Sequence, residues 1–412
     1  MMPGAALPER DRWIMVGSGV LAAALFYLGV LRPWNLADGF MVGAPVGRDF
    51  VNFWLGSHLA LHRNLDLLVD LQGYNDLVVR LFGHHAADEF VFSYPPHALL
   101  LLLPFGAMPF GAALAIWTAL NLFCIYRAGE LLAPRRDLAL IACASPAVLM
   151  MVVYGHFGGL LALLATVVLV QGGKRPVLAG LCLALMSVKP QLALLFGALL
   201  LLIGQWRIVA WSLAWTLALV AASLITFGWQ PWLNFIEWTV PHHTQLLSDF
   251  VLSQLKSTVS LYAGARMAGL PDWAAQVVQW GFGVVALAAA VIVILRRGPE
   301  PRSIALALLT VILALPYANS YDLAMAAPAL TLALFADSPA DERPLLPFVP
   351  AFLMWTLPAV APLIAAASRP LVPAVMAALL LFALARESAW RPALGGQDVI
   401  ARGVETERKG TP

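Results

Sequence analysis

The chain has 412 residues, of which 61% are hydrophobic and 12% charged, and its mean hydropathy is +0.81. Apolar runs recur from one end of the chain to the other, which indicates an integral membrane protein and excludes a soluble globular one. The net charge of +2 is too small to indicate a nucleic-acid or acidic partner. The three cysteines all lie within apolar runs, so a disulfide framework is not expected.

Apolar segments in chain order predict an all-α fold, a polytopic membrane helical bundle with about 12 transmembrane helices. The predicted spans are residues 13–31, 111–131, 138–153, 157–171, 176–188, 191–203, 206–227, 273–295, 303–316, 321–335, 345–366 and 371–385. The first has the length of a span and no small-residue cleavage site after it, which argues against a secretory signal. Several others are shorter than the about 20 residues that a perpendicular helix needs.

The distribution of basic residues predicts the orientation in the membrane. With the N-terminus inside, seventeen of the 25 arginines and lysines fall in inner segments and eight in outer ones. Both termini are then cytoplasmic. This count requires the apolar stretch 98–110, which contains Pro104 and Pro109, to be re-entrant or to lie along the interface rather than cross.

Two outer segments are long, residues 32–96 and 228–272. The first carries two apolar faces at helical spacing, which predict amphipathic helices on the membrane surface, with a packed cap as the alternative. One face comprises Phe50, Phe53, Trp54 and Leu61, and the other Leu67, Leu71, Tyr74, Leu77, Val78 and Leu81. We expect residues 1–386 to form a single transmembrane domain and the polar tail 387–412 to be disordered.

With this topology, the unusual polar residues fall together on the outer face. They lie in Arg48-Asp49-Phe50, Ser93-Tyr94-Pro95-Pro96-His97, Tyr154-Gly155-His156-Phe157-Gly158-Gly159, Ser187-Val188-Lys189-Pro190-Gln191, Pro241-His242-His243 and Tyr317-Ala318-Asn319-Ser320-Tyr321-Asp322. The inner segments contain little besides basic turns. The sequence therefore predicts a functional site outside.

Each of these groups also has a purely structural interpretation. Asp49 would pair with Arg48 or cap the helix that follows, and Asp322 would likewise cap a helix. Lys189 lies between two short apolar spans and must therefore snorkel, pair or bind an anion. His242 and His243 are adjacent on a predicted extended loop and point apart, which argues against a metal site made by this pair.

The order and spacing of these motifs resemble glycosyltransferase family 87. The resemblance is carried by Asp49-Phe50 just past the first span, Tyr94-Pro95-Pro96 closing the first outer segment, Lys189-Pro190-Gln191, and a proline followed by Tyr321-Asp322. It covers most of residues 13–335. The chain departs from the family at Gly155-His156-Phe157-Gly158, where members often have Gly-Gln-x-Asn.

This resemblance implies a GT-C fold and an enzyme of the bacterial inner membrane with an extracytoplasmic active site. Such enzymes take a sugar, mannose being favoured here, from a polyprenyl-phosphate sugar donor and transfer it with inversion to a lipid-linked or cell-envelope acceptor. Membrane lipids are the other expected partners, and nucleic acid is not one. No cofactor is expected, and the carboxylates are too scattered to predict a metal site.

The resemblance also implies roles for particular residues. Inversion needs a base for the acceptor hydroxyl, and Asp49 holds that position. The leaving phosphate needs cationic donors, for which the candidates are Lys189, His242, His243, Lys256 and Arg266. The candidates for binding the sugar or the acceptor are Arg48, Tyr94, His156, Gln191, Tyr317, Asn319, Tyr321 and Asp322.

The main alternative is a transporter or flippase of a polar lipid or sugar. Alternating access would place ionisable residues near the middle of spans and on both faces. Here the spans carry almost no internal charge and the polar motifs lie outside, which favours the enzyme. A third possibility is a non-catalytic scaffold or a ligase of surface polysaccharide.

Overall fold

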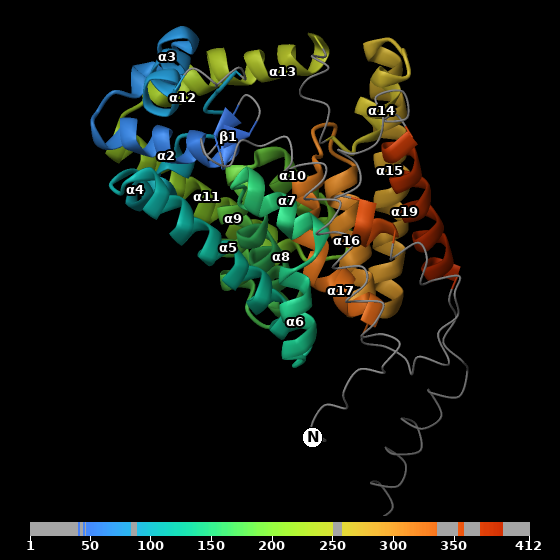
Figure 1. Cartoon of the computed structure of the whole chain (residues 1–412). Helices are drawn as coiled ribbons and strands as arrows, with labels where there is room; N and C mark the ends of the chain where they lie inside the picture. Colours follow the sequence, from blue (N-terminus) through green and yellow to red (C-terminus); the bar gives the residue numbers. More distant parts are fainter. Residues whose placement is uncertain are drawn as a thin grey trace, which may run out of the picture.

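The computed structural model describes residues 40–41, 44–45, 47–83, 89–249, 258–335, 353–357 and 371–389. These residues form a bundle of helices with shorter helices across one end (Figure 1). The predicted span 13–31, most of 345–366, Lys256 and nearly all of the polar tail lie outside the described residues. A short antiparallel pair, β1 (Phe40–Met41) and β2 (Ala44–Pro45), precedes the first helix described.

The helices follow the apolar runs closely. Every predicted span from 111 to 335, and the last at 371–385, is helical. The bundle consists of α5 (Phe110–Leu132), α6 (Arg136–Cys143), α7 (Pro146–Tyr154), α8 (Gly158–Gln171), α9 (Pro176–Leu185), η3 (Met186–Val188), α10 (Pro190–Leu202), α11 (Trp206–Phe227), α15 (Asp272–Arg297), α16 (Pro301–Leu313), η6 (Ser320–Ala326), α17 (Ala327–Phe335) and α19 (Leu371–Ala389).

The helices across the end come from the two long outer segments, except α4, which directly follows the first of them. They are α2 (Arg48–Leu61), η2 (Leu65–Leu68), α3 (Leu71–Phe82), α4 (His97–Gly106), α12 (Gln230–Asn234), the π-helical turn η4 (Phe235–Thr239), α13 (Val240–Asp249) and α14 (Leu261–Met267). In Figure 1 this end lies at the top, whereas α6 and the end of α5 lie at the opposite end. The stretch 98–110, predicted not to cross, contains α4, which has ten residues.

The predicted count of about 12 crossings is not confirmed. By length and composition, four described helices can cross a membrane: α5, α11, α15 and α19. The pair α6 and α7, bent by 50°, would make a fifth. Helices such as α8, with 14 residues, are about 21 Å long at 1.5 Å per residue, less than the ~30 Å of a hydrocarbon core.

The bend between α6 and α7 has a local cause. Pro146 occupies the first position of α7, and Ser145 before it is extended, with ψ of 149°. Proline disfavours the helical conformation in the residue that precedes it and donates no backbone hydrogen bond. The single apolar run 138–153 therefore forms two helices instead of one.

The outward faces of α11 and α15 are apolar. Leu217 and Ile225 on α11 are 69% and 87% exposed, and Trp273 and Val284 on α15 are 70% and 68% exposed. Exposed apolar surface of this kind is costly in water and is typical of helices that contact lipid. These helices therefore form the rim of the bundle.

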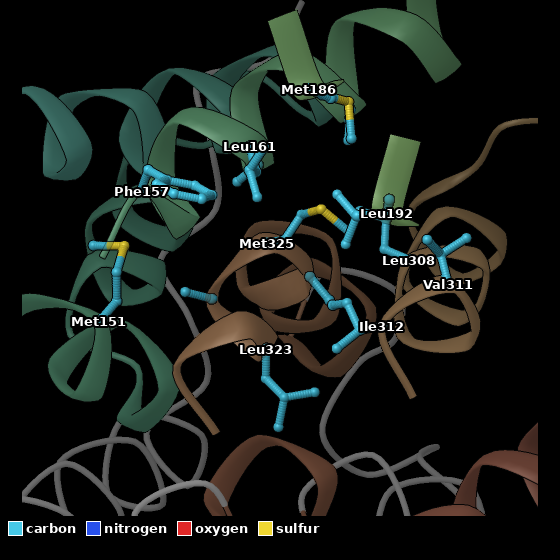
Figure 2. Close-up of a cluster of buried hydrophobic side chains, with 14 of the residues drawn as sticks. Met151, Phe157, Leu161, Met186, Leu192, Leu308, Val311, Ile312, Leu323 and Met325 are labelled. Atoms are coloured by element: carbon cyan, nitrogen blue, oxygen red, sulfur yellow. The ribbon is translucent and has the colours of Figure 1, made fainter. Parts of the chain in front are cut away.

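The core lies where α7, α8, η3, α10, α16 and η6 meet (Figure 2). Phe157 and Leu161 contribute from the start of α8, and Leu308 and Ile312 from α16, which is buried along most of its length. Lipid tails are as apolar as leucine, so close packing rather than transfer out of lipid holds such a core together.

The prediction of an amphipathic surface helix is wrong for α2. Residues 49–57 are all buried, and α2 packs against α4 and α5. Its polar residues have protein partners instead of water: Asn52 accepts a hydrogen bond from the hydroxyl of Tyr74 at 3.1 Å, and Ser57 Oγ donates to the carbonyl of Phe53 at 2.8 Å. In contrast, α3 buries Tyr74 and Val78 and is more exposed elsewhere, as an amphipathic helix should be.

A glycine sets the distance between α5 and α8. A Cβ added to Gly159 would lie 2.2 Å from the backbone oxygen of Asn121. We predict that Gly159→Ala forces the two helices apart and lowers the free energy of unfolding by about 1–3 kcal/mol, the usual cost of overpacking. Thermal unfolding of the purified protein in detergent measures this change. The matched control is Gly197→Ala on α10, where a Cβ meets nothing within 4 Å; equal midpoints for the two variants would contradict the prediction.

Candidate functional site

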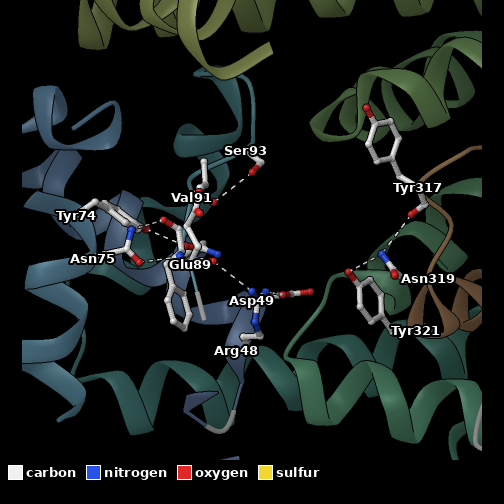
Figure 3. A network of polar contacts seen from close by, with 12 residues as sticks. Arg48, Asp49, Tyr74, Asn75, Glu89, Val91, Ser93, Tyr317, Asn319 and Tyr321 are labelled. Carbon is white, nitrogen blue, oxygen red and sulfur yellow. Dashed lines mark hydrogen bonds and ion pairs between the residues drawn. The ribbon is translucent and has the colours of Figure 1, made fainter. Parts of the chain in front are cut away.

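Several backbone breaks meet at the end of the bundle covered by the short helices. They are the start of α2, the turn between α7 and α8, the junction of η3 with α10, and the loop from α16 into η6. Figure 3 shows Arg48 and Asp49 at the start of α2 across from Tyr317 and Asn319 of that loop and Tyr321 of η6. The sequence motifs predicted to share a face therefore converge from distant parts of the chain.

The start of α2 is anchored to the turn that follows α7. Gly47 is the N-cap of α2 and donates its N–H to the carbonyl of Val153 at 3.1 Å. Gly155 has φ of +68°, and a Cβ there would lie 2.7 Å from Cβ of Phe50, so glycine suits both the conformation and the space. The indole of Trp117 donates to the carbonyl of Gly155 at 2.8 Å.

Asp49 is buried and pairs with Arg48, whose Nη1 lies 3.2 Å from its Oδ1. The predicted pairing is confirmed, whereas the predicted N-cap role is wrong because Gly47 holds that position. Burial raises the pKa of Asp49, against the charges of Arg48 and Lys189 and a hydrogen bond from Tyr321, all of which lower it. A carboxylate with a raised pKa is a stronger base than an exposed one.

Arg48 is itself held by the segment before Tyr94. Its Nη2 donates to the carbonyl of Glu89 at 3.3 Å. The side chain of Asn75 on α3 clamps the next residue, accepting from the N–H of Phe90 at 2.8 Å and donating to its carbonyl at 3.0 Å. Thus α3 positions Arg48 indirectly.

Lys189 lies at the break between η3 and α10, with Pro190 at the first position of α10. Its Nζ is 2.5 Å from Oδ1 of Asp322, 133 residues further along the chain. The ammonium also lies 5.5 Å from the ring centroid of Phe157 and 5.7 Å from that of Tyr321. The sequence left three alternatives open for Lys189: snorkelling, pairing or binding an anion. In the structure, Lys189 pairs with Asp322.

Asp322 occupies the N3 position of a capping box at the start of η6, whose N-cap is Asn319, so it takes part in the cap but is not itself the N-cap. Its Oδ2 accepts from the N–H of Asn319 at 3.0 Å. The amide of Asn319 in turn donates to the hydroxyl of Tyr321 at 3.1 Å. Asp322 therefore fixes the loop and holds Lys189 at the same time.

The loop that carries Tyr317 and Asn319 is held from the other long outer segment. The N–H of Val259 donates to the carbonyl of Ala318 at 2.8 Å, and Ser260 Oγ donates to the carbonyl of Pro316 at 2.7 Å. These hydrogen bonds give the irregular backbone of the loop partners inside the protein.

Aromatic rings surround the two carboxylates. The ring centroid of Tyr94 is 4.9 Å from that of Phe53, and the ring of His156 lies between Phe157 at 4.1 Å and Tyr321 at 4.4 Å. Burial and the charges of Asp49 and Asp322 raise the pKa of Tyr94, so its hydroxyl stays protonated. Burial, together with Lys189, lowers the pKa of His156, so its imidazole is neutral.

The remaining predicted residues lie further out. His242 and His243 are on the helix α13, not on an extended loop; His242 pairs with Glu89 at 3.0 Å, and the ring of His243 is 6.4 Å from that of Tyr317. Burial lowers the pKa of His243 to about 4. Gln191 is exposed in the first turn of α10, and Arg266 lies near Tyr262 on α14.

One residue of the site was missed by sequence reasoning. His97, the last residue of the Ser93–His97 motif, is buried at the start of α4, and its Nε2 lies 2.9 Å from Oγ of Ser187, two residues before Lys189. Its ring stacks on Trp232 at 5.8 Å. The family resemblance rests on Tyr94-Pro95-Pro96 of this motif and does not extend to His97.

No group of three His, Cys, Asp or Glu side chains is arranged to hold a metal ion among the residues that the structure describes. The convergent groups are instead two carboxylates, two cations, a neutral imidazole and protonated hydroxyls. Such a set can accept a proton, stabilise an anion and hydrogen-bond to hydroxyl groups.

Comparison with known proteins gives one match. The model of the family described as Glycosyltransferase family 87 matches residues 92–316, more than half of the chain. The matched region includes Tyr94, His156 and Lys189 but neither Asp49 nor Asp322. No curated protein and no solved structure matches the chain.

The clamp by Asn75 leads to a prediction. We expect Asn75→Ala to release the segment that carries Glu89 and Phe90, because both backbone groups of Phe90 lose their partner. Hydrogen exchange should then be faster in peptides that contain Phe90. The control is Asn234→Ala, whose side chain accepts a hydrogen bond from Gln230 at the surface of α12; unchanged exchange at Phe90 in Asn75→Ala would contradict the clamp.

Proposed function

Because this chain belongs to glycosyltransferase family 87 and is therefore a membrane glycosyltransferase, we propose that it moves a sugar from a polyprenyl-phosphate donor to an acceptor hydroxyl with inversion. The favoured sugar is mannose, and the acceptor is lipid-linked or part of the cell envelope. The site proposed for this reaction is the cluster around Asp49 and Lys189, on the extracytoplasmic side of the inner membrane.

One observation carries this proposal: a buried carboxylate with a raised pKa lies within the electrostatic reach of a lysine at a helix break. Lys189 is one of the charges that act on Asp49, although 140 positions separate them along the chain. An inverting transfer requires a base on one face of the sugar carbon and stabilisation of the leaving group on the other.

The proposed step balances in atoms and charge. The acceptor oxygen attacks the anomeric carbon while its proton passes to Asp49. The bond from that carbon to the phosphate oxygen breaks, and the electron pair stays on the phosphate. The donor phosphate thereby changes from a singly charged diester to a more highly charged monoester, which the ammonium of Lys189 stabilises. Asp49 becomes neutral as the phosphate gains its charge.

The rings beside the carboxylates suit a sugar. Tyr94 and Tyr321 are partly exposed and present hydroxyls and aromatic rings, whereas the ring of His156 is covered by Phe157 and Tyr321. We assign the sugar to this aromatic region, where ring faces stack on its C–H groups and the hydroxyls of the tyrosines bind its oxygens. The distribution of arginine and lysine supports an extracytoplasmic location.

The assignment of the base is tested by Asp49→Asn. This change keeps the shape of the side chain and removes its basicity, so we expect kcat for transfer from a synthetic polyprenyl-phosphate mannose to fall by about 10²- to 10⁴-fold. Transfer is measured with purified protein and candidate lipid acceptors. Asp66→Asn, at an exposed position of η2, is the control; wild-type transfer by Asp49→Asn would reject Asp49 as the base.

The charge of Arg48 gives a prediction for pH dependence. Arg48 lowers the pKa of Asp49, so Arg48→Gln should raise that pKa further. Since Asp49 acts as a base only when ionised, the acidic limb of the profile of kcat/KM against pH should move to higher pH. Arg63→Gln, an exposed arginine beyond α2, is the control. A limb that moves to lower pH, or does not move, would contradict the assignment.

A further inference from the structure

Lys189 already has a partner at the position where the proposed function needs it to bind phosphate. Its Nζ lies 2.5 Å from Oδ1 of Asp322, and both side chains are largely withdrawn from solvent, at 14% and 7% exposed. A donor phosphate competes directly with this carboxylate for the ammonium. When the ammonium of Lys189 binds the phosphate, its ion pair with Asp322 is weakened or lost.

Asp322 cannot be left alone at that moment without a cost. Its Oδ2 keeps the N–H of Asn319 at 3.0 Å, but Oδ1 would lose its cation. Breaking a buried pair by removing one partner leaves an uncompensated charge, which is strongly unfavourable. Donor binding therefore requires another group that can reach Oδ1.

His156 is that group. Its Nδ1 lies 3.9 Å from the same Oδ1, too far for a hydrogen bond, and has no hydrogen-bond partner among the residues that the structure describes. His156 is 2% exposed, and a buried polar atom without a partner calls for an explanation. The rings of Phe157 and Tyr321 lie 4.1 and 4.4 Å from the imidazole, each tilted by 32° to its plane, and they limit its rotation.

We propose that His156 is a positioning residue that takes over Oδ1 of Asp322, through its Nδ1–H, when Lys189 turns to the donor phosphate. This exchange of the partner of Asp322, which we call the handover, rests on the proposed function, because it requires Lys189 to bind that phosphate. A shift of roughly 1 Å would bring Nδ1 and Oδ1 to hydrogen-bond distance. No proton is transferred: the neutral imidazole donates a hydrogen bond and the carboxylate accepts it.

The neutral state of the ring fits this role. Burial and the charge of Lys189 lower the pKa of His156, so a protonated ring does not compete with Lys189 for Asp322 in the empty site. The groups around His156 are Lys189, Asp322, Phe53, Phe157 and Tyr321. Of these, Asp322 is the group that needs a new hydrogen-bond donor when it loses Lys189.

The test compares His156→Phe with His156→Gln in steady-state transfer from synthetic polyprenyl-phosphate mannose. Phenylalanine keeps a ring between Phe157 and Tyr321 but has no N–H, whereas glutamine keeps an N–H donor. We expect His156→Phe to raise KM for the donor about 10- to 100-fold, the range that one hydrogen bond to a charged group supplies. KM for the acceptor should change little, and His156→Gln should recover most of the donor affinity.

The same pair of variants in an Asp322→Asn background separates the handover from a packing effect. Asparagine at residue 322 carries no charge that needs a hydrogen-bond donor when Lys189 leaves. His156→Phe and His156→Gln should therefore have similar donor KM values in this background. An equal penalty for His156→Phe in both backgrounds, or a penalty for His156→Gln as large as that for His156→Phe, would overturn the handover. The thermal unfolding midpoint of each variant shows that it is folded.

The variant Lys189→Met distinguishes a failure of the proposed function from a failure of the handover alone. If this variant leaves KM for the donor unchanged, the phosphate role of Lys189 fails, and the handover fails with it. If Lys189→Met raises donor KM while the His156 variants do not behave as expected, the proposed function stands and the handover alone is rejected.

Discussion

Buried backbone that breaks out of a helix must find its hydrogen-bond partners within the protein, and this constraint shapes the end of the bundle that contains the candidate site. Helices of 13 or 14 residues such as α8, α10 and α16 force the chain to break repeatedly. At the covered end of the bundle, two of these breaks are closed by groups from elsewhere: Trp117 bonds to Gly155, and Val259 and Ser260 bond to Ala318 and Pro316. The same contacts that satisfy the backbone bring the polar side chains together.

The helices could be predicted from the sequence because apolar runs and prolines act locally. The run 206–227 reappears with the same bounds as α11, and Pro176 and Pro190 begin α9 and α10 at their first positions. The number of crossings could not be obtained in this way, since a short apolar helix has the same composition whether or not it reaches across. The helix α13 was missed because its residues, beginning Val240-Pro241-His242-His243, lack an apolar run.

Contacts between residues that are far apart along the chain could not be predicted from the sequence. The motifs containing Lys189 and Asp322 were each recognised, but nothing local indicates that these two side chains form an ion pair. Similarly, the apolar stripe of α2 correctly predicted a helix, whereas its surroundings depended on α4 and α5, which bury its polar face as well. His97 shows the same limit, since its contact with Ser187 spans 90 positions.

The two carboxylates of the candidate site have different environments, and this difference supports different proposed roles for them. Asp322 has both oxygens engaged, one by Lys189 and one by the backbone of Asn319, so a proton from an acceptor would have to displace a partner. Asp49 accepts hydrogen bonds from Arg48, at 3.2 Å, and from Tyr321, but burial still raises its pKa. A raised pKa favours uptake of a proton, which supports Asp49 as the proposed base. The contacts of Asp322 support a proposed role in holding the lysine and the loop.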